Sequence, residues 1–206
     1  MLTSLVGSEM CIRDRFYMSD AQEDSLLTKA VNILKKNGVI SYPTEGVWGL
    51  GCDPLSRHAV NRILSLKNRA EAKGLILIGS RHDQFANLIE KLSDEHRVRF
   101  MQNLSRPTTW ILPTNKEIPC WISGNHESVA VRVTDHPIAQ KLCSHFGRPI
   151  VSTSCNPQGV QPAINQQQVI DYFGDKLDFI VPGDVGNPGS VSDIIELTSN
   201  KVIRLG

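Results

Sequence analysis

Three short segments of the 206-residue sequence carry side chains that could bind a small anionic substrate. The first segment is residues 42–54 (YPTEGVWGLGCDP), in which a hydroxyl and a carboxylate, Thr44 and Glu45, directly follow an expected strand. Its three glycines would let the backbone approach a ligand closely, although loops of this composition are equally often simple turns. The chain has no G-x-x-x-x-G-K-[ST] loop and no Rossmann fingerprint, so any nucleotide must be bound in another way.

The second segment is residues 66–74 (LKNRAEAKG), which places three cations, Lys67, Arg69 and Lys73, between an expected helix and a buried strand. Cations at the C-terminus of a helix interact favourably with the helix dipole, so these side chains could simply cap the helix. An arginine fork and a lysine point charge also suit the several oxygens of a triphosphate. Capping and polyphosphate binding both remain open at this segment.

The third segment is residues 151–156 (VSTSCN), a strand that ends in hydroxyl and amide side chains. Such a strand end could hold a phosphate or a ribose. A serine here could instead be a hydrolase nucleophile, but the chain has no G-x-S-x-G motif and no histidine that can be assigned as its base. Cys155 also lacks a basic partner nearby in the sequence, so nucleophilic catalysis is the weaker use of this segment.

The elements around these segments alternate between helix and strand. Apolar residues spaced three and four apart predict a helix that begins at Asp20 and ends before Gly38. The same spacing predicts further helices at residues 57–66, 84–92, 94–102, 138–146 and 167–173. Alternating or continuous apolar runs predict strands at residues 39–42, 75–78, 109–112, 128–134, 150–153, 178–181, 193–197 and 202–205, and residues 43–54 are expected to be turns. This order predicts an α/β fold with a mixed, twisted sheet.

Charge and composition narrow the classes of function. Lysine and arginine number 22 against 21 acidic residues, so phosphate or nucleic-acid binding must come from a local cluster of cations. The five cysteines are scattered and never form a C-x-x-C pair, which predicts five free thiols and a reducing cytoplasm. The histidines show no metal-ligand spacing, so no protein-bound metal is expected. No apolar run approaches the ~20 residues that cross a bilayer, so no membrane association is expected.

Length and hydrophobic content predict a single domain. A chain of 206 residues, 40% of them hydrophobic, can bury a substantial core. Residues 1–17 show no pattern that connects them to this core. They are expected to be a non-native or disordered leader, with residues 18–206 forming the domain.

Four motifs in matching order and spacing resemble the YrdC/Sua5 family. They are YPTE with GLG at residues 42–51, K-x-R before KGLI at 67–76, AVRVTDHP at 130–137 and STSCN at 152–156. The likeness spans about residues 20–206 and is greatest to the short bacterial members, since no chain remains for the additional C-terminal domain of Sua5. The resemblance implies an open, strongly twisted α/β sheet around a concave, positively charged cavity.

The resemblance also implies an activity. The family forms L-threonylcarbamoyl-adenylate and pyrophosphate from ATP, L-threonine and bicarbonate, for the synthesis of N6-threonylcarbamoyladenosine in tRNA. Mg²⁺ is expected to accompany ATP, and the product is expected to pass to threonylcarbamoyl-transfer proteins. By the same resemblance, Lys67 and Arg69 are expected to be catalytic and to bind ATP together with Thr109, Ser154, Asn156 and Ser192, while Thr44 and Arg132 are expected to bind threonine.

Two other functions are compatible with the same residues. A binding module could hold tRNA or double-stranded RNA on the concave basic surface without making the adenylate. A carbamoyl-transferring relative is a weaker alternative. YrdC-like domains of hydrogenase-maturation proteins come with zinc-finger cysteines and an acylphosphatase-like part, which this chain lacks. Pyrophosphate release that requires both threonine and bicarbonate would distinguish the synthase from these alternatives.

Overall fold

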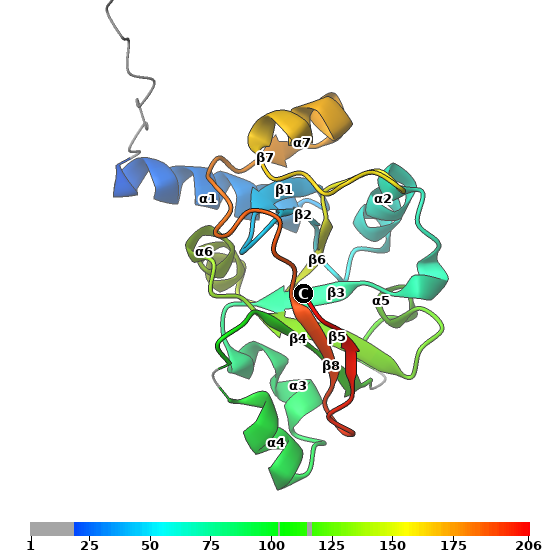
Figure 1. The fold of residues 1–206 in the computed structure, drawn as a ribbon. Coiled ribbons are helices and arrows are strands. Elements are labelled where there is room, and N and C mark those ends of the chain that lie inside the picture. The colour runs from blue at the N-terminus through cyan, green and yellow to red at the C-terminus, as the bar shows by residue number, and fades with distance from the viewer. Residues whose placement is uncertain (1–18, 103, 115–116) are drawn as a thin grey trace, which may run out of the picture.

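Helices and strands alternate along residues 19–102, 104–114 and 117–206, which are the residues that the computed structural model describes (Figure 1). The leader expected at residues 1–17 lies outside them. The helices are α1 (Asp20–Lys35), α2 (Arg57–Lys67), α3 (Ala86–Ile89), α4 (Asp94–Phe100), α5 (Cys120–Ser123), α6 (Pro137–Phe146) and α7 (Gln166–Phe173). The strands are β1 (Ile40–Pro43), β2 (Trp48–Gly51), β3 (Ile76–Gly79), β4 (Thr108–Pro113), β5 (Ser128–Val133), β6 (Ile150–Ser154), β7 (Phe179–Ile180), β8 (Asp193–Glu196) and β9 (Val202–Arg204).

Among the described residues, the strands form one nine-stranded sheet in the order β7-β1-β2-β6-β3-β5-β4-β8-β9. The pairs β1/β7, β3/β5 and β4/β8 are parallel, and the other neighbours are antiparallel. The expected α/β class with a mixed sheet is therefore confirmed. Strand β6 pairs with β2 on one side and with β3 on the other. Its hydroxyl-bearing end consequently lies in the middle of the sheet.

Strand β2 lies inside residues 43–54, where the sequence predicted only turns, so that prediction is wrong at this strand. The two large side chains of β2, Trp48 and Leu50, are fully buried. This burial outweighs the low strand propensity of the glycines that alternate with them. Close packing explains one glycine, because a Cβ on Gly51 would lie 2.7 Å from the ring of Tyr42.

Two helical regions also differ from the prediction. Helix α3 has only four residues, where a helix was expected over residues 84–92. The next helix, α4, confirms the helix predicted at residues 94–102 and begins after Ser93, whose hydroxyl caps it by accepting a hydrogen bond from the His96 backbone N–H at 3.3 Å. Helix α5 was not predicted, because its four residues are too few to show apolar periodicity.

Helices cover both faces of the sheet. On β3, Leu77 belongs to one buried cluster and Ile78 to another, because successive side chains of a strand point to opposite faces. Helices α1 and α6 pack together over the Ile78 face, with Leu27 and Leu142 fully buried there. Helices α2 and α7 contribute buried side chains to the cluster of the Leu77 face. In Figure 1, α1 and α6 lie on the left and α2 on the right.

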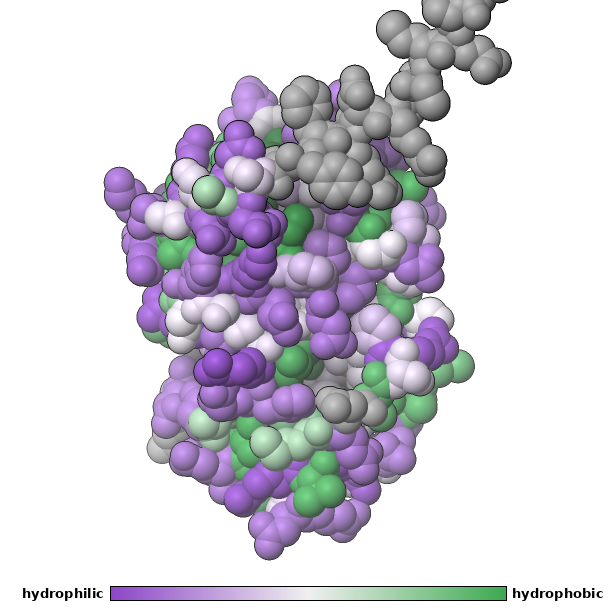
Figure 2. All heavy atoms as spheres, turned by 90° about the vertical axis from the view of Figure 1, so that its left-hand side faces the viewer, coloured by the Kyte–Doolittle hydropathy of each residue, from purple (hydrophilic) through white to green (hydrophobic). Residues whose placement is uncertain are grey.

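The surface drawn in Figure 2 is mostly hydrophilic, and its hydrophobic side chains occur in small separate groups. In the part of the chain that the structure describes, no helix combines the length and the apolar character that a membrane span requires. The described cysteines, Cys52, Cys120, Cys143 and Cys155, all carry free thiols, as predicted. Cys11 lies outside the described residues.

Candidate functional site

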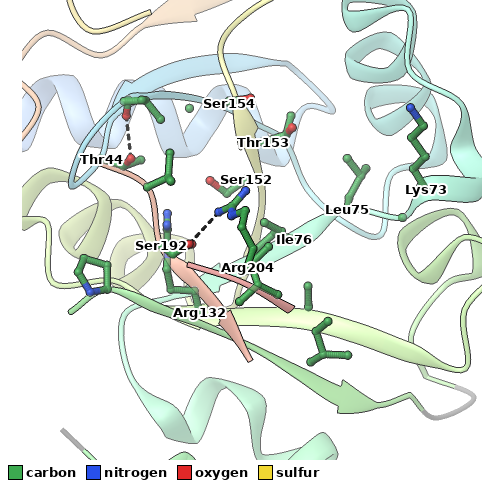
Figure 3. Close-up of a pocket in the computed structure, with 18 of the residues that line it drawn as sticks. Thr44, Lys73, Leu75, Ile76, Arg132, Ser152, Thr153, Ser154, Ser192 and Arg204 are labelled. Carbon is green, nitrogen blue, oxygen red and sulfur yellow. Dashed lines mark hydrogen bonds between the residues drawn. The ribbon is translucent and has the colours of Figure 1, made fainter. Parts of the chain in front are cut away.

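A cavity of about 450 Å³ lies where β2, β3, β5 and β6 come together. This volume is within the range of small-molecule binding sites. The turn between β1 and β2, the segment that precedes β8, and residues of β4, α5, β8 and β9 complete the wall. Figure 3 shows Thr44 at one end of the cavity and Lys73 at the other, with Ser152 and Ser154 between them.

Strand β5 shows how the sequence places a side chain in this cavity. Ser128, Ala130 and Arg132 line the cavity. Val129 and Val131 alternate with them and are buried in the core, although Val129 also borders the cavity. Because strand side chains alternate between the two faces, this apolar pattern fixes Arg132 on the cavity side.

Most of the charge on the described lining is positive. The cationic side chains are Arg69, Lys73, Arg132 and Arg204, and the acidic one is Glu45. Guanidinium and ammonium groups bind the oxygens of phosphates and carboxylates. The lining is therefore suited to an anionic substrate.

Arg69 lies on the cavity wall just after the end of α2. Its Nε and Nη2 atoms donate to the carbonyl oxygen of Gly74 at 3.3 and 2.9 Å, which fixes the plane of the guanidinium. Burial lowers the pKa of Arg69, but an arginine side chain stays charged at neutral pH. Within the described residues, Nη1 has no protein partner. Arg69 can therefore offer a donor and a full charge to an anion.

Lys67 lies behind the cavity wall and is only 6% exposed. Its Nζ atom donates to the carbonyl oxygen and to Oδ1 of Asn156, both at 2.9 Å, and to the carbonyl oxygen of Ser154. Burial, together with the nearby positive charge of Arg69, lowers the pKa of Lys67 to about 8. Lys67 thus ties the end of α2 to the loop that follows β6.

The loop after β6 is shaped by its own hydrogen bonds. Ser154 Oγ donates to Asn156 Oδ1 at 2.6 Å. Asn156 Nδ2 donates to the carbonyl oxygens of Val160 and Pro157 at 2.6 and 3.2 Å. Ser154 lines the cavity, whereas Asn156 lies outside the lining. The amide of Asn156 therefore acts on the loop that presents Ser154.

Thr109 reaches the cavity only through a neighbour. It is fully buried on β4, and its Oγ1 lies 2.8 Å from the Oγ of Ser192. Ser192 lines the cavity, and its carbonyl oxygen accepts a hydrogen bond from Arg204 Nη2 at 2.8 Å. Figure 3 shows this bond between Ser192 and Arg204 as a dashed line.

Thr44, Glu45 and Arg132 gather at one end of the cavity. Thr44 Oγ1 donates to the carbonyl oxygen of Val47 at 2.7 Å. Arg132 Nη2 lies 3.4 Å from Glu45 Oε2, and Thr134 Oγ1 donates to Glu45 Oε1 at 2.6 Å. Burial alone raises the pKa of the Glu45 carboxyl, but the charge of Arg132 and the Thr134 hydroxyl outweigh burial and hold this pKa below its usual value. An ionised carboxylate and a guanidinium therefore lie side by side.

The structure brings part of the expected site together in one cavity. Three of the expected residues lie behind its wall. Each of these three forms a hydrogen bond with a residue that lines the cavity, or with the loop on which such a residue lies. The expected residues that line the cavity are Thr44, Arg69, Arg132, Ser154 and Ser192, and those behind the wall are Lys67, Thr109 and Asn156.

Three charged residues of the cavity were not among the expected site residues. Glu45 directly follows Thr44 in the first segment singled out by the sequence analysis, and Lys73 follows Arg69 by four residues in the second. Their position was therefore an available signal. Arg204 gives no local signal, because it reaches the cavity only through the pairing of β9 with β8.

Comparisons with known proteins agree with one another. The family model Sua5_yciO_yrdC, described as "Telomere recombination", matches residues 32–206. The chain is 46% identical over 175 residues to the threonylcarbamoyl-AMP synthase of Cellvibrio japonicus, an alignment that covers 85% of this chain and 93% of that protein. It is 44% identical over 190 residues to the threonylcarbamoyl-AMP synthase of Marinobacter nauticus, covering 91% of this chain and 100% of that protein.

Solved structures share the fold. Sua5 of P. abyssi in complex with L-threonine superposes with a TM-score of 0.76 at 30% identity, covering 85% of this chain and 52% of that chain. E. coli YciO superposes with a TM-score of 0.75 at 27% identity, covering 89% of each chain. This chain thus spans about half the length of the Sua5 chain and most of the length of YciO.

Proposed function

The chain belongs to the Sua5/YciO/YrdC family, and we propose that it is an enzyme that makes L-threonylcarbamoyl-adenylate from ATP, L-threonine and bicarbonate. One observation carries the proposal. A chain 46% identical to a threonylcarbamoyl-AMP synthase encloses a cavity of about 450 Å³ whose lining includes Thr44, Arg69 and Arg132. The cavity has the size and the cationic side chains that three small substrates, two of them anionic, require.

The reaction determines what the protein must supply. The amine of threonine and bicarbonate give a carbamate, with loss of water. A carbamate oxygen then attacks the α-phosphorus of ATP, and pyrophosphate leaves. No covalent intermediate with the protein is needed, so the side chains contribute positioning and charge. The cavity offers cations and hydroxyls for these two tasks.

Arg69 takes the phosphate oxygens of ATP in this proposal. Its guanidinium is already fixed against Gly74, so little side-chain freedom is lost when an anion binds. Ser154 adds a hydroxyl, and Lys67 and Asn156 hold the loop that presents this hydroxyl. Lys67 therefore acts as a positioning residue from behind the wall.

Thr109 plays a similar part for Ser192. The hydrogen bond between the two hydroxyls, 2.8 Å long, orients the Ser192 side chain at the cavity wall. Ser192 then offers the nucleotide a hydroxyl that the buried Thr109 orients.

Threonine occupies the end of the cavity formed by Thr44 and Arg132. The Arg132 guanidinium suits the carboxylate of the amino acid. Sua5 of P. abyssi, which shares the fold, binds L-threonine. Thr44 Oγ1 donates to Val47 and keeps its lone pairs for a donor group of the substrate.

Mg²⁺ is expected to accompany ATP, but the cavity does not make a protein cage for it. Among the described residues, no group of three or more His, Cys, Asp or Glu side chains could hold a metal ion. The one acidic side chain of the described lining, Glu45, is shared among Arg132, Thr134 and Asp135. The metal would therefore be carried by the triphosphate, as Mg²⁺ commonly is.

The product feeds a tRNA modification in this proposal. A threonylcarbamoyl-adenylate is a reactive acyl phosphate, and transfer proteins would move its threonylcarbamoyl group to adenosine in tRNA. We place the enzyme in the cytoplasm, where ATP and tRNA are available and where free thiols persist. Direct binding of tRNA or double-stranded RNA is the weaker alternative, because the relatives are named for the synthase reaction.

Substrate omission tests the proposal. Pyrophosphate release is measured with ATP, L-threonine and bicarbonate together, and again with each one left out. We expect release only in the complete mixture. Release without threonine, or no release in the complete mixture together with tight RNA binding, would favour another function.

A further inference from the structure

The proposed reaction joins groups that the cavity holds at opposite ends. Threonine lies at the end formed by Thr44 and Arg132, and Arg69 takes the phosphate oxygens of ATP nearer the other end. The amine of threonine, bicarbonate and the α-phosphorus must therefore meet in the middle of the cavity. Figure 3 shows Ser152 in this middle part, between Thr44 and Lys73.

The pairing of strands also places Ser152 midway between the two ends. Ile76 of β3 pairs with Ser152 of β6. Two residues further along β3, Ile78 pairs with Arg132 of β5, which marks the threonine end. Two residues before Ile76 is Gly74, whose carbonyl oxygen holds the phosphate-binding arginine. Two residues of a strand span about 6.6 Å, so Ser152 lies one such step from the level of each end.

Ser152 is the polar member of its row across the sheet. The neighbours in this row, Ile76 and Ala130, are apolar. Ser152 is 5% exposed and lines the cavity, so its accessible surface is turned to the cavity. Its hydroxyl lies within hydrogen-bonding reach of the buried Tyr42 hydroxyl, which itself donates to the Val151 carbonyl oxygen at 3.4 Å. Because a hydrogen bond to an anion is about twice as strong as one between neutral groups, the Ser152 hydrogen turns towards an anion that enters the cavity.

Gly49 leaves a space beside the Ser152 hydroxyl. Gly49 lines the cavity on β2, and a Cβ at this position would lie 3.4 Å from Ser152 Oγ and 3.4 Å from Thr44 Cγ2. The place of a side chain is therefore open between the Ser152 hydroxyl and the residue that marks the threonine end. Bicarbonate is the smallest of the three substrates and needs little more room than a short side chain.

We propose that the Ser152 hydroxyl binds bicarbonate in the space beside Gly49 and then holds the carboxyl group of the carbamate that forms there. The proposal rests on the proposed function and gives its third substrate a place in the cavity. Bicarbonate then lies next to the amine of threonine, and Arg132 supplies positive charge one step along the sheet. A hydrogen bond from Ser152 to one carbamate oxygen leaves the other oxygen free to attack the α-phosphorus. Ser152 is therefore a catalytic residue.

The test measures initial rates of pyrophosphate release in buffers freed of dissolved carbon dioxide. Each substrate is varied in turn while the other two are saturating. In Ser152→Ala we expect the KM for bicarbonate to rise about ten- to a hundredfold, the equivalent of one charge-assisted hydrogen bond. The KM values for ATP and for threonine should stay close to those of the wild type.

Gly49→Ala is a second, independent probe. The added methyl group occupies the proposed space and meets its nearest neighbours only at 3.4 Å, so we expect an unchanged melting temperature and a selective rise in the KM for bicarbonate. This variant keeps the inference testable if Ser152→Ala does not fold. Ser80→Ala is the matched control, because Ser80 is also 5% exposed but is not part of the cavity lining. It should have the wild-type KM for bicarbonate.

The outcomes separate the inference from the proposed function. A wild-type KM for bicarbonate in folded Ser152→Ala and Gly49→Ala proteins overturns the inference and leaves the synthase proposal intact. An equal rise in the KM for threonine also overturns it, because Ser152 then belongs to the threonine site. A selective rise in both variants, with wild-type behaviour of Ser80→Ala, supports the inference. A wild-type protein that releases no pyrophosphate from the complete mixture overturns the proposed function and the inference with it.

Discussion

Lys67 and Arg69 are two residues apart and lie on opposite sides of the cavity wall. Asn68 between them ends α2 in the left-handed conformation, with φ of 49°. Asparagine tolerates this conformation better than most residues. The turn sends the Lys67 side chain beneath the loop after β6 and the Arg69 side chain to the lining. One short motif therefore supplies both a cation behind the wall and a cation on the cavity lining.

Replacing Arg69 should affect catalysis more than folding. Arg69→Ala removes a cation on the lining, so we expect kcat/KM for adenylate formation to fall about ten- to a hundredfold, the scale of one charge-assisted hydrogen bond. Its partly exposed position limits the stability loss to about 1 kcal/mol. Arg69→Lys should recover only part of the activity, because lysine lacks the planar fork. Turnover by Arg69→Ala equal to that of the wild type would remove this residue from the site.

Replacing Lys67 should affect both folding and catalysis. Lys67→Met keeps the length of the side chain but leaves the oxygens of Ser154 and Asn156 without their buried donor. We expect the free energy of unfolding to fall by about 1–3 kcal/mol, the cost of buried unsatisfied polar groups. Urea denaturation measures this loss. A variant as stable as the wild type but inactive would instead show that Lys67 binds substrate directly.

At the scale of elements, the segment from residue 182 to residue 192 crosses the end of the cavity. Backbone hydrogen bonds join this segment to the turn between β1 and β2. Gly186 N donates to the Thr44 carbonyl oxygen at 3.1 Å, and Gly189 N donates to the Gly46 carbonyl oxygen at 2.8 Å. The contact is close, because a Cβ on Gly46 would lie 1.9 Å from the Ser190 carbonyl oxygen. This crossing segment brings Ser192 to the lining.

A methyl group at position 46 should separate the crossing segment from the turn. Gly46→Ala needs a backbone shift, so we expect a stability loss of about 1–3 kcal/mol, as for other overpacked sites. Gly49→Ala in the same hairpin is the control, since its Cβ would meet neighbours only at 3.4 Å. Thermal melting of both variants measures the difference. Equal melting temperatures would argue against close packing of the crossing segment.

A carboxylate, that of Asp178, connects the start of β1 to α2 by hydrogen bonds, and its contribution to the stability of the fold depends on pH. Asp178 accepts hydrogen bonds from Val39 N–H at 2.6 Å and from Arg62 Nη1 at 2.6 Å. Burial alone raises the pKa of Asp178, but the hydrogen bonds from Arg62 and Val39 outweigh burial and lower it. A carboxyl with a lowered pKa in the folded state stabilises the fold above its unfolded pKa, and this stability is lost as the pH falls through the folded pKa.

The consequence can be measured with Asp178→Asn. At pH 7 we expect the variant to be less stable than the wild type by about 1 kcal/mol or less, because solvent screens this half-exposed pair. The difference should shrink as the pH falls below about 4, the usual value for an aspartate, because protonation removes the advantage of the wild type. Urea titrations between pH 7 and pH 3 test this. A difference that grows on acidification would contradict the assignment.

At the scale of the whole molecule, the sequence predicts what depends on local pattern. The family resemblance indicated Arg132, which the alternation of β5 then places on the cavity side, and the hydroxyls at the end of β6 marked Ser154. The turn between Lys67 and Arg69 was not predictable, because spacing along the chain does not show which side of a wall each side chain will face. Arg204 was missed because it is brought to the cavity only by the order of strands at the sheet edge.

The most direct test of the central claim is mass-spectrometric detection of the product made from ¹³C-labelled bicarbonate, ATP and L-threonine. The account predicts a threonylcarbamoyl-adenylate heavier by one mass unit than the product from unlabelled bicarbonate. It also predicts that pyrophosphate accumulates in equal amount and that Arg69→Ala gives far less of both. Unlabelled product, or ATP cleaved to ADP and phosphate, would contradict attack of a bicarbonate-derived carbamate on the α-phosphorus.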